Sequence, residues 1–137
     1  MKIMIIDDSK TARLFVKKTL LMALGSSDIK VDIVETDNGE NALLALANDH
    51  QFDLILSDVN MPVMSGFTFM HNLRLKSDLM KIPVVFVTSL SNSGNQHNLI
   101  ELGAYAVISK PVSVAVLDEI LTSLNLKTHD TDGGWGN

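Results

Sequence analysis

The segment Leu54-Ile55-Leu56-Ser57-Asp58 joins a continuous apolar run to an acidic residue. Four other short apolar runs occur at 3–6, 31–34, 84–87 and 104–108. Most are rich in Val and Ile, and four of the five are nearly continuous, which is typical of strands covered on both faces. The run at 31–34 is of mixed polarity, so we expect it at an edge of the sheet.

Helical patterns separate these runs. Apolar residues share one helical face within 12–23, 42–47, 69–73 and 116–124. Gly25 stands where the first helix should stop, and Ser113 is expected to cap the last one. The fourth helix should begin within 92–98, but this segment holds three Asn and one Gly. Because these residues are poor helix formers, we expect a loose or late-starting helix there.

Strand and helix alternate five times along the chain. This order predicts an α/β domain with a parallel sheet, right-handed crossovers and helices on both faces. A chain of 137 residues has room for one domain, which we place at 1–126. Residues 127–137 show no periodicity and are predicted to form a flexible C-terminal tail.

Composition excludes several classes of function. The net charge is −5 and no basic stripe is present, which argues against direct nucleic-acid binding. The chain has no apolar run of membrane-spanning length, so membrane insertion is not expected. The lack of cysteine excludes disulfides, thiolate metal sites and thiol catalysis. These features indicate a cytoplasmic protein.

Polar side chains follow four of the five predicted strands, and sites of open α/β sheets form beyond the carboxyl ends of the strands. Three carboxylates held together repel one another, and a hard divalent cation would resolve that repulsion. Ligands that are all oxygen fit Mg²⁺ better than zinc or copper. The residues at the strand ends are Asp7 and Asp8, then Asp58, Thr88 and Lys110.

A carboxylate in such a site can attack phosphorus and form an acyl phosphate. Asp58 is the best nucleophile candidate, because it lies between the acidic pair and the two phosphoryl-binding candidates, Thr88 and Lys110. The alternative is that an Asp after a strand is a turn or capping residue, and Asp8 in particular could cap the first helix. Five polar residues at four strand ends make this alternative much weaker.

Four segments together resemble the signature of response regulator receiver domains. They are Ile5-Ile6-Asp7-Asp8-Ser9, residues 56–66, Val87-Thr88-Ser89 and Ser109-Lys110-Pro111. The resemblance covers residues 2 to about 125 and implies the CheY-like, flavodoxin-like (βα)₅ fold, a doubly wound parallel sheet with strand order 2-1-3-4-5. It implies a signalling protein of two-component phosphorelays that switches its protein-binding surface when phosphorylated. Because the chain has room for one domain only, we expect a stand-alone receiver.

The resemblance also implies the role of each site residue. Asp58 is the phosphoacceptor, and it receives the phosphoryl group from a histidine kinase or a histidine-phosphotransfer protein. The output of the phosphorylated domain is binding of a downstream target protein. Such a module is not a conventional enzyme, although it assists its own phosphorylation and dephosphorylation. The Mg²⁺ ligands implied are Asp8, Asp58, the backbone carbonyl of Asn60 and, through water, Asp7; the phosphoryl-binding residues are Thr88 and Lys110.

Two positions bear on switching. The aromatic residue usual three positions before the lysine is Val107 here, and Tyr105 is the only aromatic residue nearby. We therefore expect backbone and the fourth helix, rather than a ring, to carry the change, with Tyr105 a bystander. The resemblance further implies a cis peptide bond between Lys110 and Pro111, and a turn at Gly66 where a Cβ would be awkward.

Three rival functions are weaker. Flavin binding would place a phosphate against the negative charges of Asp7-Asp8-Ser9-Lys10, so no flavin is expected. Aspartyl-phosphate hydrolases place an acid/base Asp two residues after the nucleophile, whereas this chain has Asn60 there. A degenerate receiver that only binds proteins is disfavoured because all the chemical residues are present.

Overall fold

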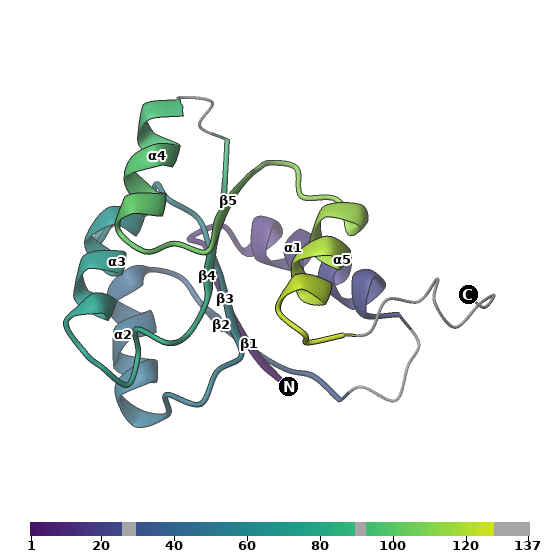
Figure 1. The fold of residues 1–137 in the computed structure, drawn as a ribbon, viewed down its shortest axis with the longest axis horizontal. Helices are drawn as coiled ribbons and strands as arrows, with labels where there is room; N and C mark the ends of the chain where they lie inside the picture. The colour runs from purple at the N-terminus through teal and green to yellow at the C-terminus, as the bar shows by residue number, and fades with distance from the viewer. Residues whose placement is uncertain (26–29, 90–92, 128–137) are drawn as a thin grey trace.

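The computed structural model describes residues 1–25, 30–89 and 93–127. Five parallel strands form one sheet in the order β2-β1-β3-β4-β5. Helices α1 and α5 cover one face, and α2, α3 and α4 cover the other (Figure 1). This is the predicted flavodoxin-like fold. The elements are β1 Lys2–Ile6, α1 Lys10–Leu24, β2 Asp32–Thr36, α2 Gly39–Asn48, β3 Leu54–Ser57, α3 Gly66–Arg74, β4 Val84–Thr88, α4 Ser93–Glu101, β5 Ala106–Ser109 and α5 Val114–Ser123.

The sheet separates two apolar cores, because alternate residues of a strand point to opposite faces. On β1, Ile3 and Ile5 belong to the core under α1 and α5, whereas Met4 and Ile6 belong to the core under α2 and α3. All four side chains are at most 2 % exposed. Burying a side chain of this size stabilises the fold by roughly 1.5–3 kcal/mol.

The two edge strands differ from the central ones in burial. β2 lies at one edge, as predicted, and none of its residues is fully buried. The run at 104–108 was predicted to be a strand covered on both faces. Instead, β5 forms the other edge of the sheet and is only partly buried. The reason is that β5 pairs with β4 alone, which leaves its other side open.

Local capping signals are placed as the sequence predicts. Gly25 caps α1 with φ of 77°, and Ser113 Oγ accepts a hydrogen bond from the Val116 N–H. The capping role considered for Asp8 is wrong, because Ser9 is the N-cap of α1 and its Oγ lies 3.1 Å from Ala12 N. A cap of this kind is worth about 1 kcal/mol. The Asp8 carboxylate is therefore available for the site.

The prediction for the fourth helix is wrong in its late start. Helix α4 begins at Ser93, one residue into the segment 92–98, and residue 92 itself lies outside the described residues. Leu99, which is 1 % exposed, anchors α4 in the core. Packing of this kind routinely overrides a weak intrinsic preference.

The described chain extends one residue past the predicted domain boundary. The Lys127 side chain is 5 % exposed and lies 2.7 Å from Asp118 Oδ1, and its ammonium also donates to the carbonyl of Ala23. Lys127 is thus held against α1 and α5, whereas the rest of the predicted tail, 128–137, lies outside the described residues. Every helix in the described part of the chain is too short or too polar to span a membrane.

Candidate functional site

The carboxyl ends of β1 and β3 bring three carboxylates together. Ile6 and Ser57 are register partners in these neighbouring strands, so Asp7 and Asp58 follow them side by side. The Asp58 N–H donates to the Ile6 carbonyl at 2.9 Å. Carboxylate oxygens of Asp7, Asp8 and Asp58 all lie within 4.8 Å of one another. The sequence placed these residues at one rim, and the structure confirms it.

Lys110 reaches this cluster from the loop after β5. Its ammonium nitrogen lies 3.2 Å from Asp7 Oδ2 and 3.3 Å from Asp58 Oδ2. The Lys110 N–H donates to the Thr88 carbonyl at 2.9 Å, which attaches the loop to the end of β4. The peptide bond between Lys110 and Pro111 is cis, as predicted.

Burial makes these charges interact strongly. The side chains of Asp7 and Asp58 are 5 % and 12 % exposed, and that of Lys110 is 29 % exposed. Burial acts to lower the pKa of the Lys110 ammonium, but the negative charges of Asp58 and Asp7 and their hydrogen bonds outweigh it. The pKa of Lys110 therefore lies above its ordinary value, and the side chain is a fixed positive charge at neutral pH.

Backbone donors orient two of the carboxylates. Asp58 Oδ1 accepts a hydrogen bond from the Val59 N–H at 2.7 Å, and Asp7 Oδ1 accepts one from the Ser9 N–H at 2.9 Å. Each group thus has one oxygen on the main chain and the other on Lys110. The protein itself therefore fixes the orientation of both carboxylates.

The remaining predicted residues lie around this centre. Thr88 ends β4, is 1 % exposed and pairs with Ser109, the residue before the lysine. Asn60 is exposed in the turn two residues after Asp58. Val107 is partly buried and pairs with Phe86 across β4 and β5.

Gly66 keeps the turn after Asp58 close to the sheet. A Cβ at this position would lie 2.7 Å from Phe86 Cε1 and 3.0 Å from Val59 Cα. The Gly66 N–H donates to the Val59 carbonyl at 2.7 Å. Only glycine fits so close an approach, which confirms the prediction that a Cβ is unfavourable here.

Sequence reasoning missed Arg13. Its Nη1 donates to the main-chain carbonyl of Asp7 at 2.6 Å, and its Nε lies 3.0 Å from Glu35 Oε1. The available signal was its position in the first turn of α1, shortly after the acidic pair. Its partner Glu35 is 22 residues away on β2, so no local pattern identifies the contact.

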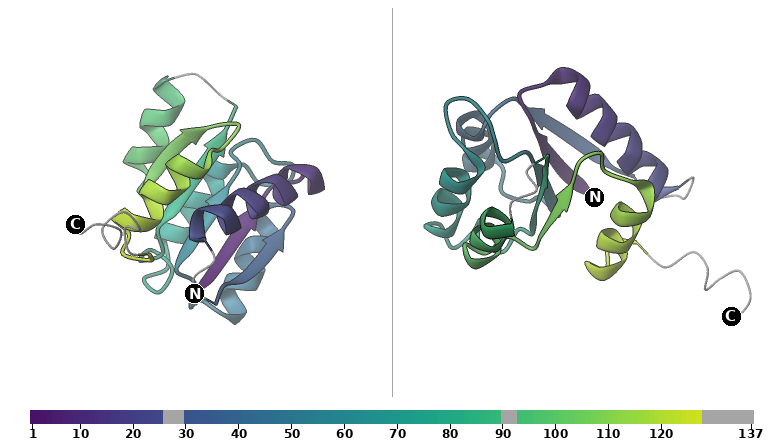
Figure 2. Two further views of the ribbon diagram at one scale, coloured as in Figure 1. Left: turned by 90° about the vertical axis from the view of Figure 1, so that its right-hand side faces the viewer. Right: turned by 90° about the horizontal axis from the view of Figure 1, so that it is seen from above.

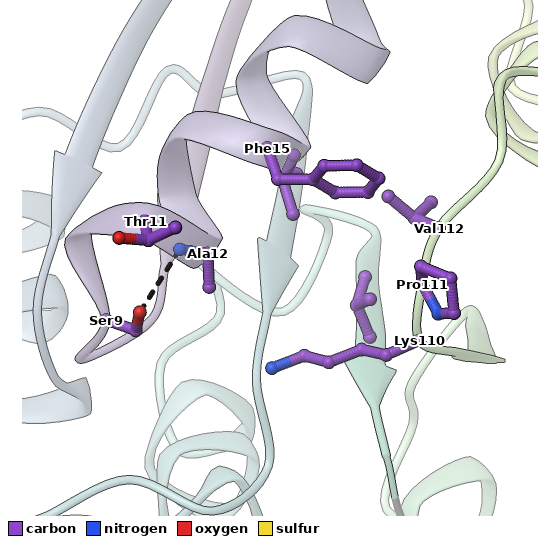
Figure 3. Close-up of a pocket in the computed structure, with 9 residues that line it drawn as sticks. Ser9, Thr11, Ala12, Phe15, Lys110, Pro111 and Val112 are labelled. Carbon is purple, nitrogen blue, oxygen red and sulfur yellow. Dashed lines mark hydrogen bonds between the residues drawn. The ribbon is translucent and has the colours of Figure 1, made fainter.

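An apolar cavity of about 520 Å³ is lined in part by Lys110, whose ammonium contacts Asp7 and Asp58. Figure 3 shows the Phe15 ring facing Val112 across it and the Lys110 side chain reaching toward the start of α1. The cavity is lined by the first half of α1, by Val87 of β4 and by the loop that carries Lys110 and Pro111. Sequence reasoning did not predict it, because its walls come from segments about 100 residues apart.

The donor set fits a hard divalent cation. Three carboxylates and one ammonium leave a formal charge of −2, which a divalent ion neutralises. All the candidate ligand atoms are oxygen, as Mg²⁺ prefers. Asp8 is the exposed member of the cluster, so a cation held there would be open to solvent.

A sequence profile of the response regulator receiver domain matches residues 3–122. The chain belongs to this family. The receiver domain is 34 % identical over 124 residues to the chemotaxis protein CheY-3 of Vibrio cholerae, covering 90 % of this chain and 91 % of that protein. It is also 33 % identical over 96 residues to the probable transcriptional regulator ycf29 of Porphyra purpurea, of which it spans only 46 %.

Solved structures show the same fold. The receiver domain matches the chemotaxis response regulator CheY4 of Vibrio cholerae with a TM-score of 0.74 and 31 % identity, covering 90 % of this chain and 97 % of that one. The receiver domain of the sensor histidine kinase PA1611 from Pseudomonas aeruginosa has a TM-score of 0.75 and 22 % identity, with 90 % and 95 % covered. That neighbour is described with a magnesium ion coordinated in its active-site cleft.

Proposed function

We propose that this receiver domain accepts a phosphoryl group on Asp58 and thereby switches the protein surface that it presents. The observation that carries the proposal is the position of Asp58, with Oδ1 held by a backbone N–H and Oδ2 3.3 Å from the Lys110 ammonium. A carboxylate oriented in this way is a prepared nucleophile. The output is binding of a target protein.

The transfer is an in-line displacement at phosphorus. An Asp58 carboxylate oxygen forms the new O–P bond while the P–N bond to a donor phosphohistidine breaks, and the bonding electron pair stays on the imidazole nitrogen. Lys110 places a positive charge where it can neutralise one oxygen of the transferred phosphoryl group. The Thr88 hydroxyl is the candidate hydrogen-bond donor to a second phosphoryl oxygen. These roles make the protein a phosphoacceptor that assists its own chemistry.

We infer that Asp8, Asp58 and the main-chain carbonyl of Asn60 hold Mg²⁺, with Asp7 contributing through water. The formal charge of −2 and the oxygen donors support this assignment. When bound, the ion would neutralise charge on the phosphoryl group. The cytoplasmic location expected from composition stays a prediction.

The phosphoryl donor is a histidine kinase or a histidine-phosphotransfer protein, and α1 with the adjoining cavity is its docking face. Phe15 lines the cavity and is 49 % exposed, and the preceding residue on α1, Leu14, is exposed to the same degree. Helix α1 carries four cationic residues and no acidic one, in a chain with net charge −5. A partner with an apolar side chain for the cavity and an acidic rim complements this face.

Acetyl phosphate with MgCl₂ tests the core of the proposal without any partner. Intact mass spectrometry should show one phosphoryl adduct on the wild type and none on Asp58→Asn, which keeps the shape of the side chain but removes the nucleophile. Ser57→Ala, next to it on β3, is the matched control and should still be modified. An adduct of equal yield on Asp58→Asn would assign the nucleophile to another residue.

A further inference from the structure

Arg13 links the ends of two strands through one guanidinium group. Its Nη1 lies 2.6 Å from the main-chain oxygen of Asp7, just beyond β1, and its Nε lies 3.0 Å from Glu35 on β2. The Arg13 side chain is 16 % exposed. A planar guanidinium donates in fixed directions, so two bonds to two elements define its position well.

The acidic pair is held unequally. Asp7 is secured at every polar group: its N–H donates to the Thr36 carbonyl at 3.2 Å, its carbonyl accepts from Arg13, and its carboxylate accepts from Ser9 and Lys110. The exposed Asp8 carboxylate accepts no hydrogen bond from the described residues. Its direction therefore depends on the peptide that joins Asp7 to Asp8, and the oxygen of that peptide is the atom that Arg13 holds.

We propose that Arg13 is a positioning residue for the metal site: by fixing the Asp7–Asp8 peptide, it aims the Asp8 carboxylate at the position of the divalent cation. Glu35 in turn orients Arg13. This inference rests on the proposed Mg²⁺ site and adds a residue to its support. Groups that orient metal ligands without touching the metal commonly change affinity by 10–100-fold when they are replaced.

Simple electrostatics predicts the opposite sign. Arg13 is a cation near a site for another cation, so its removal should strengthen Mg²⁺ binding if charge alone mattered. A positioning role predicts that its removal weakens binding. The two accounts are thus separated by the direction of the change as well as by its size.

Lys17 provides a matched control. It lies one turn further along α1, its ammonium is 3.8 Å from the same Glu35 side chain, and it carries the same charge. Among the described residues, its only ion pair is with Glu35, and it makes no hydrogen bond to Asp7. Lys17→Gln therefore removes a like charge from the same cluster without releasing the Asp7–Asp8 peptide.

The experiment is a titration of the full chain with MgCl₂ in which NMR chemical shifts report Mg²⁺ binding. It is carried out on wild type, Arg13→Gln, Lys17→Gln and Asp8→Asn. We expect Arg13→Gln to bind Mg²⁺ about 10-fold or more weakly. Lys17→Gln should stay within about 2-fold of wild type or bind slightly more tightly. In acetyl phosphate reactions, raising MgCl₂ toward saturation should restore the rate of Arg13→Gln, because its defect lies in the occupancy of the metal site. Because bound Mg²⁺ also stabilises the folded state, this rescue supports the positioning role only when Arg13→Gln is folded without MgCl₂, which its NMR spectrum at the start of the titration shows.

The outcomes separate this inference from the proposed function. If wild type and Asp8→Asn bind Mg²⁺ equally, the proposed metal site is wrong. If Asp8→Asn loses binding but Arg13→Gln binds as tightly as wild type or more tightly, only the positioning role is overturned. Should Arg13→Gln fail to fold, Arg13→Lys decides. That variant keeps the charge but loses the two-directional donor, so weaker binding supports the role and unchanged binding overturns it.

Discussion

The ammonium nitrogen of Lys110 lies 3.3 Å from Oδ2 of Asp58, although 52 residues separate them in the chain. The contact exists because β3 and β5 lie on either side of β4, so their carboxyl ends reach the same rim (Figure 1). It places a positive charge beside the proposed acceptor before phosphorylation. The view from above in Figure 2 shows α1 and α5 on one side of the sheet and α2, α3 and α4 on the other.

Replacing Lys110 should destabilise the protein and change its response to alkaline pH. Lys110→Met leaves Asp7 and Asp58 buried without their cation, and we expect a loss of roughly 1.5–3 kcal/mol in the free energy of unfolding at pH 8. Because the folded-state pKa of Lys110 is raised above 10.5, its stabilising effect is fully present below pH 10.5. It is lost as the pH rises through the folded-state value.

Urea unfolding of wild type and Lys110→Met from pH 8 to pH 12 measures how much Lys110 stabilises the fold at each pH. The difference in unfolding free energy should stay constant up to about pH 10.5 and then shrink. A difference that grows above pH 10.5 would contradict the assigned ion pair.

Removing the charge of Asp8 should stabilise the metal-free protein. Three carboxylates within 4.8 Å repel one another, and Asp8→Asn relieves part of that repulsion. We expect a gain of about 1 kcal/mol in the unfolding free energy in a chelating buffer, since Asp8 is exposed. In saturating MgCl₂ the order should reverse, because only the wild type gains full stabilisation from bound metal. Thermal melts in both buffers test it, and a stability of Asp8→Asn below wild type without metal would show that Asp8 is not part of the repelling cluster.

A change on the docking face of α1 should slow phosphotransfer from a protein donor but not phosphorylation by acetyl phosphate. Phe15→Ser removes a half-exposed ring from the cavity wall. We expect the rate of phosphotransfer from the cognate histidine donor to fall by 10-fold or more, as for the loss of an interface anchor. The rate with acetyl phosphate should stay within about 2-fold. Leu44→Ser removes another exposed apolar side chain, on α2, and is the control that should affect neither rate. Equal losses with both donors would mean that Phe15 supports the site itself.

The conformational change on phosphorylation should not require movement of an aromatic ring. Tyr105 is 43 % exposed, and its hydroxyl lies 2.7 Å from Ser123 Oγ. Because Ser123 gives its single proton to the Ile120 carbonyl, Tyr105 is the donor in that bond. Tyr105→Phe should therefore cost about 1 kcal/mol of stability but keep the response to phosphorylation.

NMR shifts with and without beryllofluoride, a phosphoryl mimic, measure that response. Thr88→Ala should remain modifiable yet lose most of the shifts in 93–107, because no hydroxyl follows the phosphoryl group. Tyr105→Phe should retain them. If Tyr105→Phe lost the response instead, the ring would be the switch and the interpretation of Val107 would be wrong.

Much of this molecule was readable from the sequence. Runs of Val, Ile and Leu predicted the strands, and helical spacing with Ser113 and Gly25 predicted where helices begin and end. These patterns involve residues close together in the chain, so they can be interpreted without knowledge of the tertiary structure. The acidic, hydroxyl and lysine residues at the strand ends also predicted one rim, because parallel strands place their carboxyl ends together.

Only the tertiary structure decided the rest. Arg13 contacts both the Asp7 carbonyl and Glu35, which is 22 residues away, and the Lys127 ammonium contacts both Asp118 on α5 and the carbonyl of Ala23 on α1. The start of α4 at Ser93, against a poor local preference, follows from packing. Such contacts join segments that are distant in sequence, and their energies arise only when the sheet has brought the segments together. The order of strands and the polar residues after them could therefore predict which groups meet at the rim, while the groups that orient them became visible only in the assembled fold.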